Sequence, residues 1–145
     1  MSRQSASAKS GSMADPVRKY LKSRGVSDEL IEGGLDGAVD RWDTISQTAK
    51  NYDFTLDDWL NDMDLRDIID GALKAAEKPE RDAVSPRLKR ADARLRKATV
   101  ETGSIWGAPM PGEEARDPSK SWWYFRRPLN PGETMQEDLE AAGLD

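Results

Sequence analysis

Histidine and cysteine are both absent from this chain of 145 residues. Without cysteine, the chain can form neither disulfides nor thiolate metal sites. Without histidine, it lacks the commonest general base and the commonest zinc ligand, so Ser-His-Asp and Cys-His catalytic arrangements are excluded. Any catalysis would have to use carboxylates, Lys, Arg, Tyr or Ser.

Apolar residues are scarce as well. They make up 37% of the chain, against about 45–50% in a typical globular protein, so the sequence predicts a small core. No apolar run approaches the roughly 18 residues that a membrane span needs, and the N-terminus lacks the apolar segment of a secretory signal. We therefore expect a cytoplasmic protein that does not contact membranes. Residues 1–14 are rich in Ser, Ala, Lys and Gly and are expected to form a disordered tail.

The N-terminal part of the chain carries strong helix signals. Asp15 is followed by proline, the typical order of an N-cap and a first helical residue, and Gly25 is a natural stop. Between residues 31 and 52, apolar side chains recur at steps of three and four, which is helical spacing. Gly33 and Gly34 interrupt this pattern, so we expect a break in the helix or a close helix crossing there.

Two further helix starts follow one another closely. Thr55 and Asp64 each have the sequence context of an N-cap in a capping box. This pattern predicts two separate helices, at residues 56–62 and 65–77. Pro79 then marks the end of the second helix.

The last third of the chain alternates between helical and irregular composition. A Ser-Pro pair predicts the start of a basic helix at residues 86–100. Residues 102–132 are rich in Pro and Gly and have the composition of a long irregular arm. Thr134 has the position of an N-cap in a capping box and Gly143 that of a helix stop, which predicts a short C-terminal helix at residues 133–143.

These signals together predict an all-α fold. We expect a small multi-helix domain of short helices with a Pro- and Gly-rich aromatic C-terminal arm. Residues 15–145 would form a single domain, with a helical core at about 15–101, a wrapping arm at 102–132 and the short helix at 133–143.

Charge is unevenly distributed along the chain. Residues 27–77 hold fourteen acidic and four basic side chains, whereas residues 78–100 hold eight basic and three acidic ones. We therefore expect the basic helix to pack antiparallel to the acidic helices and to pair with them. As alternatives, the acidic face could meet a basic protein surface, or residues 86–97 could contact phosphates of a nucleic acid, which the net charge of -5 disfavours. We assign to the acidic face Asp57, Asp58, Asp62 and Asp67.

The segment SWWYFRRP, residues 121–128, concentrates aromatic side chains. In an extended backbone, alternate side chains face opposite ways, so Trp122 and Tyr124 would share one face of this segment. We expect it to be mainly a core element that closes over the helices, with an interface on its outer side, because Trp, Tyr and Arg dominate interface energies. The candidate partner-binding residues are Trp122, Trp123, Tyr124, Phe125, Arg126 and Arg127.

The acidic stretch DDWLNDMD, residues 57–64, resembles a DDxxD-type magnesium motif at first sight. Helix capping accounts for Asp58, Asp64 and Asp67 without a metal. The EF-hand pattern fails as well, because no glycine stands at the sixth position. We therefore predict no metal site and no cofactor.

The leading functional hypothesis is a non-enzymatic cytoplasmic module that binds another protein as an adaptor, regulator or inhibitor. Self-association as a homodimer is a variant of this hypothesis. A rival hypothesis is a carboxylate-dependent enzyme, assisted by a divalent cation, for which Asp57, Asp58 and Asp62 are the candidates. The third is weak nucleic-acid binding through the basic helix at residues 86–97.

Overall fold

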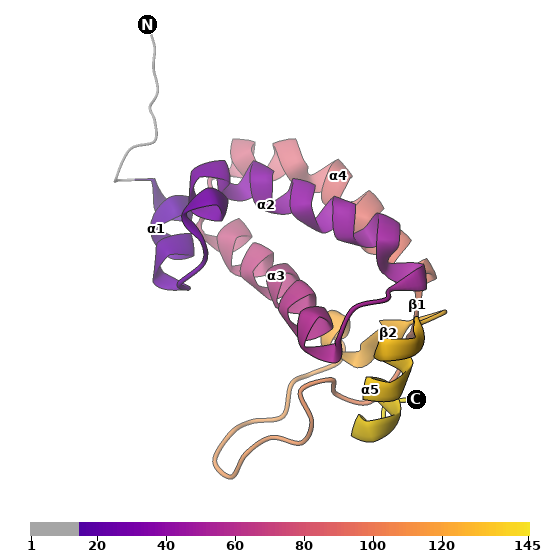
Figure 1. Cartoon of the computed structure of the whole chain (residues 1–145). Helices are drawn as coiled ribbons and strands as arrows, with labels where there is room; N and C mark the ends of the chain where they lie inside the picture. The colour runs from indigo at the N-terminus through magenta and orange to yellow at the C-terminus, as the bar shows by residue number, and fades with distance from the viewer. Residues whose placement is uncertain (1–14) are drawn as a thin grey trace, which may run out of the picture.

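Figure 1 shows the computed structural model, which describes residues 15–145. The tail expected at residues 1–14 lies outside the described residues. The elements in chain order are the helices α1 (Pro16–Ser23) and α2 (Asp28–Thr48), the 3-10 helix η1 (Ala49–Asn51), the helices α3 (Leu56–Ala75) and α4 (Lys78–Lys97), the strand β1 (Thr99–Glu101), the 3-10 helix η2 (Trp122–Phe125), the strand β2 (Arg126–Pro128) and the helix α5 (Glu133–Ala142). Over the described residues the fold is all-α apart from the antiparallel pair of β1 and β2, as the sequence predicts.

Three long helices form the centre of the molecule. Short connections join α2 to α3 and α3 to α4, so α3 runs against both of its neighbours, and α2 and α4 run in the same direction side by side (Figure 1). Helix α1 packs against α2 and α3 at one end, and the small sheet and α5 lie at the other end. The core is built around Trp42, Trp59 and Trp123, which are fully buried. Across residues 15–145, no helix combines the length and the apolar composition that a bilayer crossing requires.

Several local signals act as the sequence predicts. The Asp15 carboxylate accepts a hydrogen bond from the backbone N–H of Val17 at 3.0 Å and thereby caps α1. Thr55 heads α3 in a complete capping box. Gly34 has a φ of 62° and breaks the helical geometry inside α2, and Gly143 ends α5 with a φ of 72°. Both values lie in the left-handed region, where a side chain would add strain.

The two helices expected at residues 56–62 and 65–77 are one continuous helix, α3. The second N-cap signal was misleading, because Asp64 does not cap a helix end. Its Oδ1 instead accepts a hydrogen bond at 2.5 Å from the Tyr124 hydroxyl, which belongs to η2. A tertiary contact therefore uses the side chain that the local pattern assigned to a cap.

Helix α4 begins at Lys78, eight residues before the expected start at residue 86. Pro79 does not end the preceding helix; it stands in the first turn of α4, where the N–H that proline lacks has no helical partner. Pro86 is accommodated inside the helix, although it removes one backbone hydrogen bond. The Ser-Pro pair is therefore internal to α4.

Helix α5 starts two residues earlier than a Thr134 cap would place it. Its N-cap is Gly132, which provides no side-chain hydrogen bond. The backbone N–H of Gly132 donates to the carbonyl of Tyr52 at 2.8 Å, so the entry to α5 is fixed against η1 and the segment after it. A Cβ at Gly132 would lie 1.9 Å from Oδ1 of Asp53, which explains why a residue without a side chain caps this helix.

The basic helix pairs with the acidic helix α2, as expected, but it runs parallel to α2 and antiparallel only to α3. Arg87 lies 2.8 Å from Asp36 and 3.4 Å from Asp40, and Arg94 lies 2.7 Å from Asp43. The later arginine of α4 pairs with the later aspartate of α2, so the two helices run parallel. The charges of opposite sign at residues 27–77 and 78–100 are thus matched partly within the molecule.

Candidate functional site

The aromatic segment is mainly a core element. Trp123 and Tyr124 are each 2% exposed, whereas Trp122 and Phe125 are half-buried. The expected alternation of faces is wrong, because residues 122–125 form a 3-10 helix and not an extended strand. Successive side chains of a 3-10 helix are about 120° apart and not on opposite faces, and Trp123 and Tyr124 both enter the core.

Cations cover the rings of this segment, but they come from other elements. The Arg66 guanidinium of α3 lies 4.8 Å from the ring centroid of Trp123, and that of Arg96 on α4 lies 4.0 Å from Trp122. Such contacts are attractive because the faces of aromatic rings carry partial negative charge. These contacts attach η2 to α3 and to α4.

Arg126 and Arg127 hold the arm in place. The Nε of Arg126 donates to the Thr99 hydroxyl at 2.8 Å, and one terminal nitrogen donates to the Arg96 carbonyl at 3.1 Å, at the C-terminal end of α4. Arg127 donates to the carbonyl of Asp145 at 3.4 Å. Trp122, Phe125 and Arg126 line a hollow of about 330 Å³ and are half-buried, as Arg127 is.

A buried polar contact joins four elements, and the sequence analysis did not identify it. Asp92 on α4 accepts hydrogen bonds from Trp42 Nε1 at 2.8 Å and from Arg66 Nε at 3.0 Å. A second oxygen of Asp92 accepts from another Arg66 nitrogen at 3.1 Å. Because Arg66 also stacks on Trp123, this one carboxylate connects α2, α3, α4 and η2.

The acidic residues predicted as one face serve separate purposes. Asp58 accepts from the backbone N–H of Thr55 at 3.1 Å, and Asp67 lies 3.5 Å from Arg24. Asp57 is exposed in the first turn of α3. Over residues 15–145, no group of three or more acidic side chains is placed to hold a metal ion.

Asp62 has the most unusual environment of the acidic set. It accepts a hydrogen bond at 2.7 Å from the hydroxyl of Tyr52, whose side chain is buried. Burial raises the pKa of the Asp62 carboxyl, and the hydrogen bond from Tyr52 offsets part of that increase. Burial and the neighbouring carboxylate together raise the pKa of Tyr52 far above its ordinary value.

An open groove lies between α2 and α3, with Asp62 on its α3 side. One part of it has a volume of about 600 Å³, and an adjoining part of about 340 Å³ shares Arg41 and Asp62 with the first. We call this surface the α2–α3 groove. Its lining residues are Glu29, Leu30, Gly33, Gly37, Asp40, Arg41, Thr44, Ile45, Tyr52, Phe54, Asp58, Asn61 and Asp62.

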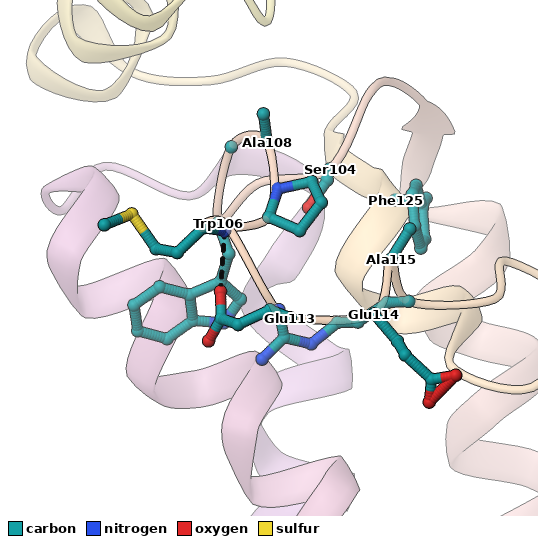
Figure 2. Close-up of a pocket in the computed structure, with 11 residues that line it drawn as sticks. Ser104, Trp106, Ala108, Glu113, Glu114, Ala115 and Phe125 are labelled. Carbon is teal, nitrogen blue, oxygen red and sulfur yellow. Dashed lines mark hydrogen bonds between the residues drawn. The ribbon is translucent and has the colours of Figure 1, made fainter.

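A second hollow, of about 610 Å³, lies within the loop that follows β1 (Figure 2). Trp106 and Met110 on this loop are 43% and 68% exposed. The backbone N–H of Met110 donates to the Glu113 carboxylate at 2.8 Å, the contact drawn dashed in Figure 2. Apart from Phe125, every residue that lines this hollow belongs to residues 104–116, so its shape depends on one loop. The α2–α3 groove, in contrast, is lined by long helices: α2 supplies eight of the nine residues of its larger part, and α3 supplies Asp62 there and Asp58, Asn61 and Asp62 in its smaller part.

Comparison with known proteins assigns no role to these surfaces. No protein-family model, curated protein or solved structure matches the chain. The functional argument therefore depends on the geometry of the residues described above.

Proposed function

We propose that this protein is a non-enzymatic cytoplasmic module that binds another protein, as an adaptor, regulator or inhibitor, through the α2–α3 groove. The observation that carries this proposal is a groove that α2 lines along most of its length and that α3 borders at one end, with apolar and acidic side chains among its lining residues. Phe54, at one end of the groove, is 62% exposed. An aromatic side chain left in solvent beside a groove is a typical anchor for a partner.

The charges near the groove also support a binding role. Glu29, Asp40, Asp58 and Asp62 line it, and Arg41 is the one basic residue among its lining residues. A surface with an excess of one sign accelerates and orients the approach of a partner with the opposite sign. The basic helix compensates only Asp40 among these four acids, because Arg87 reaches Asp40 from the far side of α2.

A carboxylate-dependent enzyme is the second candidate, and one observation favours it. Asp62 lies in the groove with a raised pKa, and perturbed carboxyl groups in clefts are common in active sites. Against this, the Asp62 carboxylate already accepts a hydrogen bond from Tyr52, and the Asp58 carboxylate accepts one from the backbone N–H of Thr55 in the capping box. A rise in Tm on addition of magnesium or manganese, in the wild type but not in Asp62→Asn, would support the enzyme hypothesis. An unchanged Tm of the wild type would contradict a metal-assisted enzyme.

Nucleic-acid binding has less support. Arg87 and Arg94, two of the basic residues at 86–97, are paired with acids of α2. Lys89, Arg90 and Lys97 are exposed on α4 and would be the available phosphate contacts. A low-salt gel shift with single- and double-stranded DNA and RNA that shows no complex would remove this hypothesis.

Site-specific photo-crosslinking tests the proposal directly. A photoreactive residue replaces Thr44, which is exposed in the groove, and in a matched variant it replaces Ala93, which is exposed on α4. Both proteins are irradiated in extract of the native cell, and the captured protein is then purified and titrated against the wild type. We expect one protein to be captured from position 44 and not from 93. Capture of the same proteins from both positions, or of none from 44, would contradict the proposal.

A further inference from the structure

The glycines of the groove have no structural role that the molecule itself reveals. A Cβ built at Gly33 or at Gly37 meets no atom of residues 15–145 within 4 Å, and neither residue has the positive φ that requires glycine. Glycine in a helix interior costs about 1 kcal/mol relative to alanine. Gly71 on α3 differs, because a Cβ there would lie 1.9 Å from the Tyr20 hydroxyl.

The two glycines lie on the face of α2 that lines the groove. Gly37, Arg41 and Thr44 are spaced by four and three residues, so they share one face of the segment of α2 that follows the break at Gly34. Leu30 and Gly33 line the groove from the segment before the break. The lining residues of the second segment, from Gly37 to Ile45, extend over about 12 Å at the helical rise per residue. Gly33 and Gly37 have no side chain beyond the backbone, so another backbone can approach α2 closely there.

The chemistry of the walls specifies what would fill the space. Leu30, Ile45 and Phe54 supply apolar contacts, and Glu29 and Asp62 supply negative charge near the two ends of the groove. An apolar stripe flanked by basic side chains would satisfy both sets of groups. An amphipathic helix presents such a stripe with a period that matches the helical walls.

We propose that the α2–α3 groove binds a basic amphipathic helix of a partner protein, whose backbone crosses α2 over Gly33 and Gly37. Charge complementarity selects the sign of the partner, because acids outnumber bases along the groove. The glycines set the depth at which the helix lies, as small residues do where two helices approach closely. This inference depends on the proposed function and specifies its partner.

A direct test uses a labelled 18-residue peptide of Leu, Ala and Lys in amphipathic order as the probe. Two further peptides serve as controls: the same composition in scrambled order, and the same order with Glu in place of Lys. Fluorescence anisotropy with the full chain measures the Kd of each peptide. We expect the amphipathic basic peptide to bind at least about tenfold more tightly than either control, a difference of about 1.4 kcal/mol. Equal affinities for the basic and scrambled peptides would overturn the inference.

Two matched variants locate the binding site. Gly37→Leu fills the groove, and Ala93→Leu adds the same side chain to the exposed face of α4. Gly37→Leu should weaken peptide binding about tenfold or more, and Ala93→Leu should leave it unchanged. Thermal unfolding of both variants tests whether the fold is retained. If Gly37→Leu does not fold, Glu29→Gln provides a milder change in the same groove. Unchanged binding in Gly37→Leu, or in Glu29→Gln if that variant is needed, would overturn the inference.

Two other results would identify a different occupant or separate the two proposals. If the wild type forms dimers that Gly37→Leu abolishes, the occupant is a second copy of this chain and the inference is wrong. If position 44 captures a protein in the crosslinking experiment while the basic peptide fails to bind, the interaction function stands and the helical occupant is rejected.

Discussion

The two long faces of α2 lie in contrasting surroundings. The face toward α4 is closed: Trp42 is fully buried, and Asp36 and Asp43 are paired with arginines. The face that carries Gly33 and Gly37 is open, because no atom of residues 15–145 lies within 4 Å of a Cβ built at either glycine. One helix thus combines an interface that is completed within the molecule with one that is left incomplete. The difference shows that charge pairing with α4 accompanies the closed face, whereas the open face has no helix of residues 15–145 packed over its glycines.

The largest expected loss of stability comes from removing the Asp92 carboxylate, which accepts hydrogen bonds from Trp42 and Arg66 on the closed side of α2. Asp92→Asn removes the nearer carboxylate of Arg66, at 3.0 Å, and leaves Asp70 at 3.8 Å; Arg66 is 8% exposed. Removal of one partner from a buried ion pair costs about 3–5 kcal/mol. Because Asp70 remains, urea unfolding should show a loss of stability near the lower end of this range. Asp82→Asn removes only an exposed pair with Lys78 and should change stability by less than about 0.5 kcal/mol; equal effects of the two changes would contradict the structure.

High pH should weaken the contacts of α3 while it leaves the α2–α4 pairs intact. Burial and aspartate neighbours raise the pKa of Tyr52 and of Tyr124 far above the ordinary value. A group with a raised pKa keeps its full contribution below its unfolded pKa, here about 10, and loses it as the pH rises further. Each tyrosine should therefore lower the unfolding free energy by about 1.4 kcal/mol per pH unit above pH 10. The arginines remain charged over this range.

The variant Tyr52→Phe separates the two tyrosines. Stability measured by urea unfolding between about pH 9 and 11 should fall about half as steeply as in the wild type, because only the Tyr124 hydroxyl still titrates abnormally. Tyr124→Phe should give a similar slope. A slope that is unchanged in both variants would show that neither hydroxyl retains its proton in the folded protein.

The glycine in α3 provides the next test. Gly71→Ala should destabilise the protein by about 1–3 kcal/mol, because the new methyl group overlaps the Tyr20 ring. In a Tyr20→Ala background, the same change should have no cost, since the space is then free. Chemical unfolding of the four proteins gives this coupling. Equal effects of Gly71→Ala in both backgrounds would contradict the contact between α1 and α3.

The smallest expected effect concerns the charge pairs between α4 and α2. Arg94 and Asp43 are 2.7 Å apart and are 43% and 27% exposed. Exposed pairs contribute about 0.2–1 kcal/mol in double-mutant cycles. A cycle with Arg94→Gln and Asp43→Asn should give a coupling energy in this range that decreases with added salt. A coupling energy of zero at low salt would show that the pair does not contribute.

Local signals predicted the fold where the side chain acts on its own backbone. Asp15, Thr55 and Gly143 start or stop helices as their neighbours in sequence indicate. The signals at Asp64 and Thr134 failed, because contacts from distant parts of the chain fix those positions: Tyr124 occupies Asp64, and the entry to α5 is held by a backbone bond to Tyr52. Capping rules consider only residues close in sequence, so they cannot predict such long-range partners.

The site was only partly predictable for a related reason. The pattern of charges indicated that α4 pairs with acidic helices, but the parallel register with α2 depends on the lengths of connections that the sequence misassigned. Arg66 and Asp92 had a signal that could have been used, since each is a minority charge on the apolar side of its helix. A break or a close helix crossing was predicted at Gly33 and Gly34. Gly34 makes the break, and no atom of residues 15–145 lies within 4 Å of a Cβ built at Gly33.

The most direct test of the central claim is the unfolding free energy of Gly37→Ala in the isolated protein. Among residues 15–145, no atom uses the space over Gly37. Alanine should therefore stabilise the helix by about 0.5–1 kcal/mol, the usual gain over glycine in a helix interior. A loss of stability would show that a neighbour within the molecule fills the groove, and it would contradict the open face of α2.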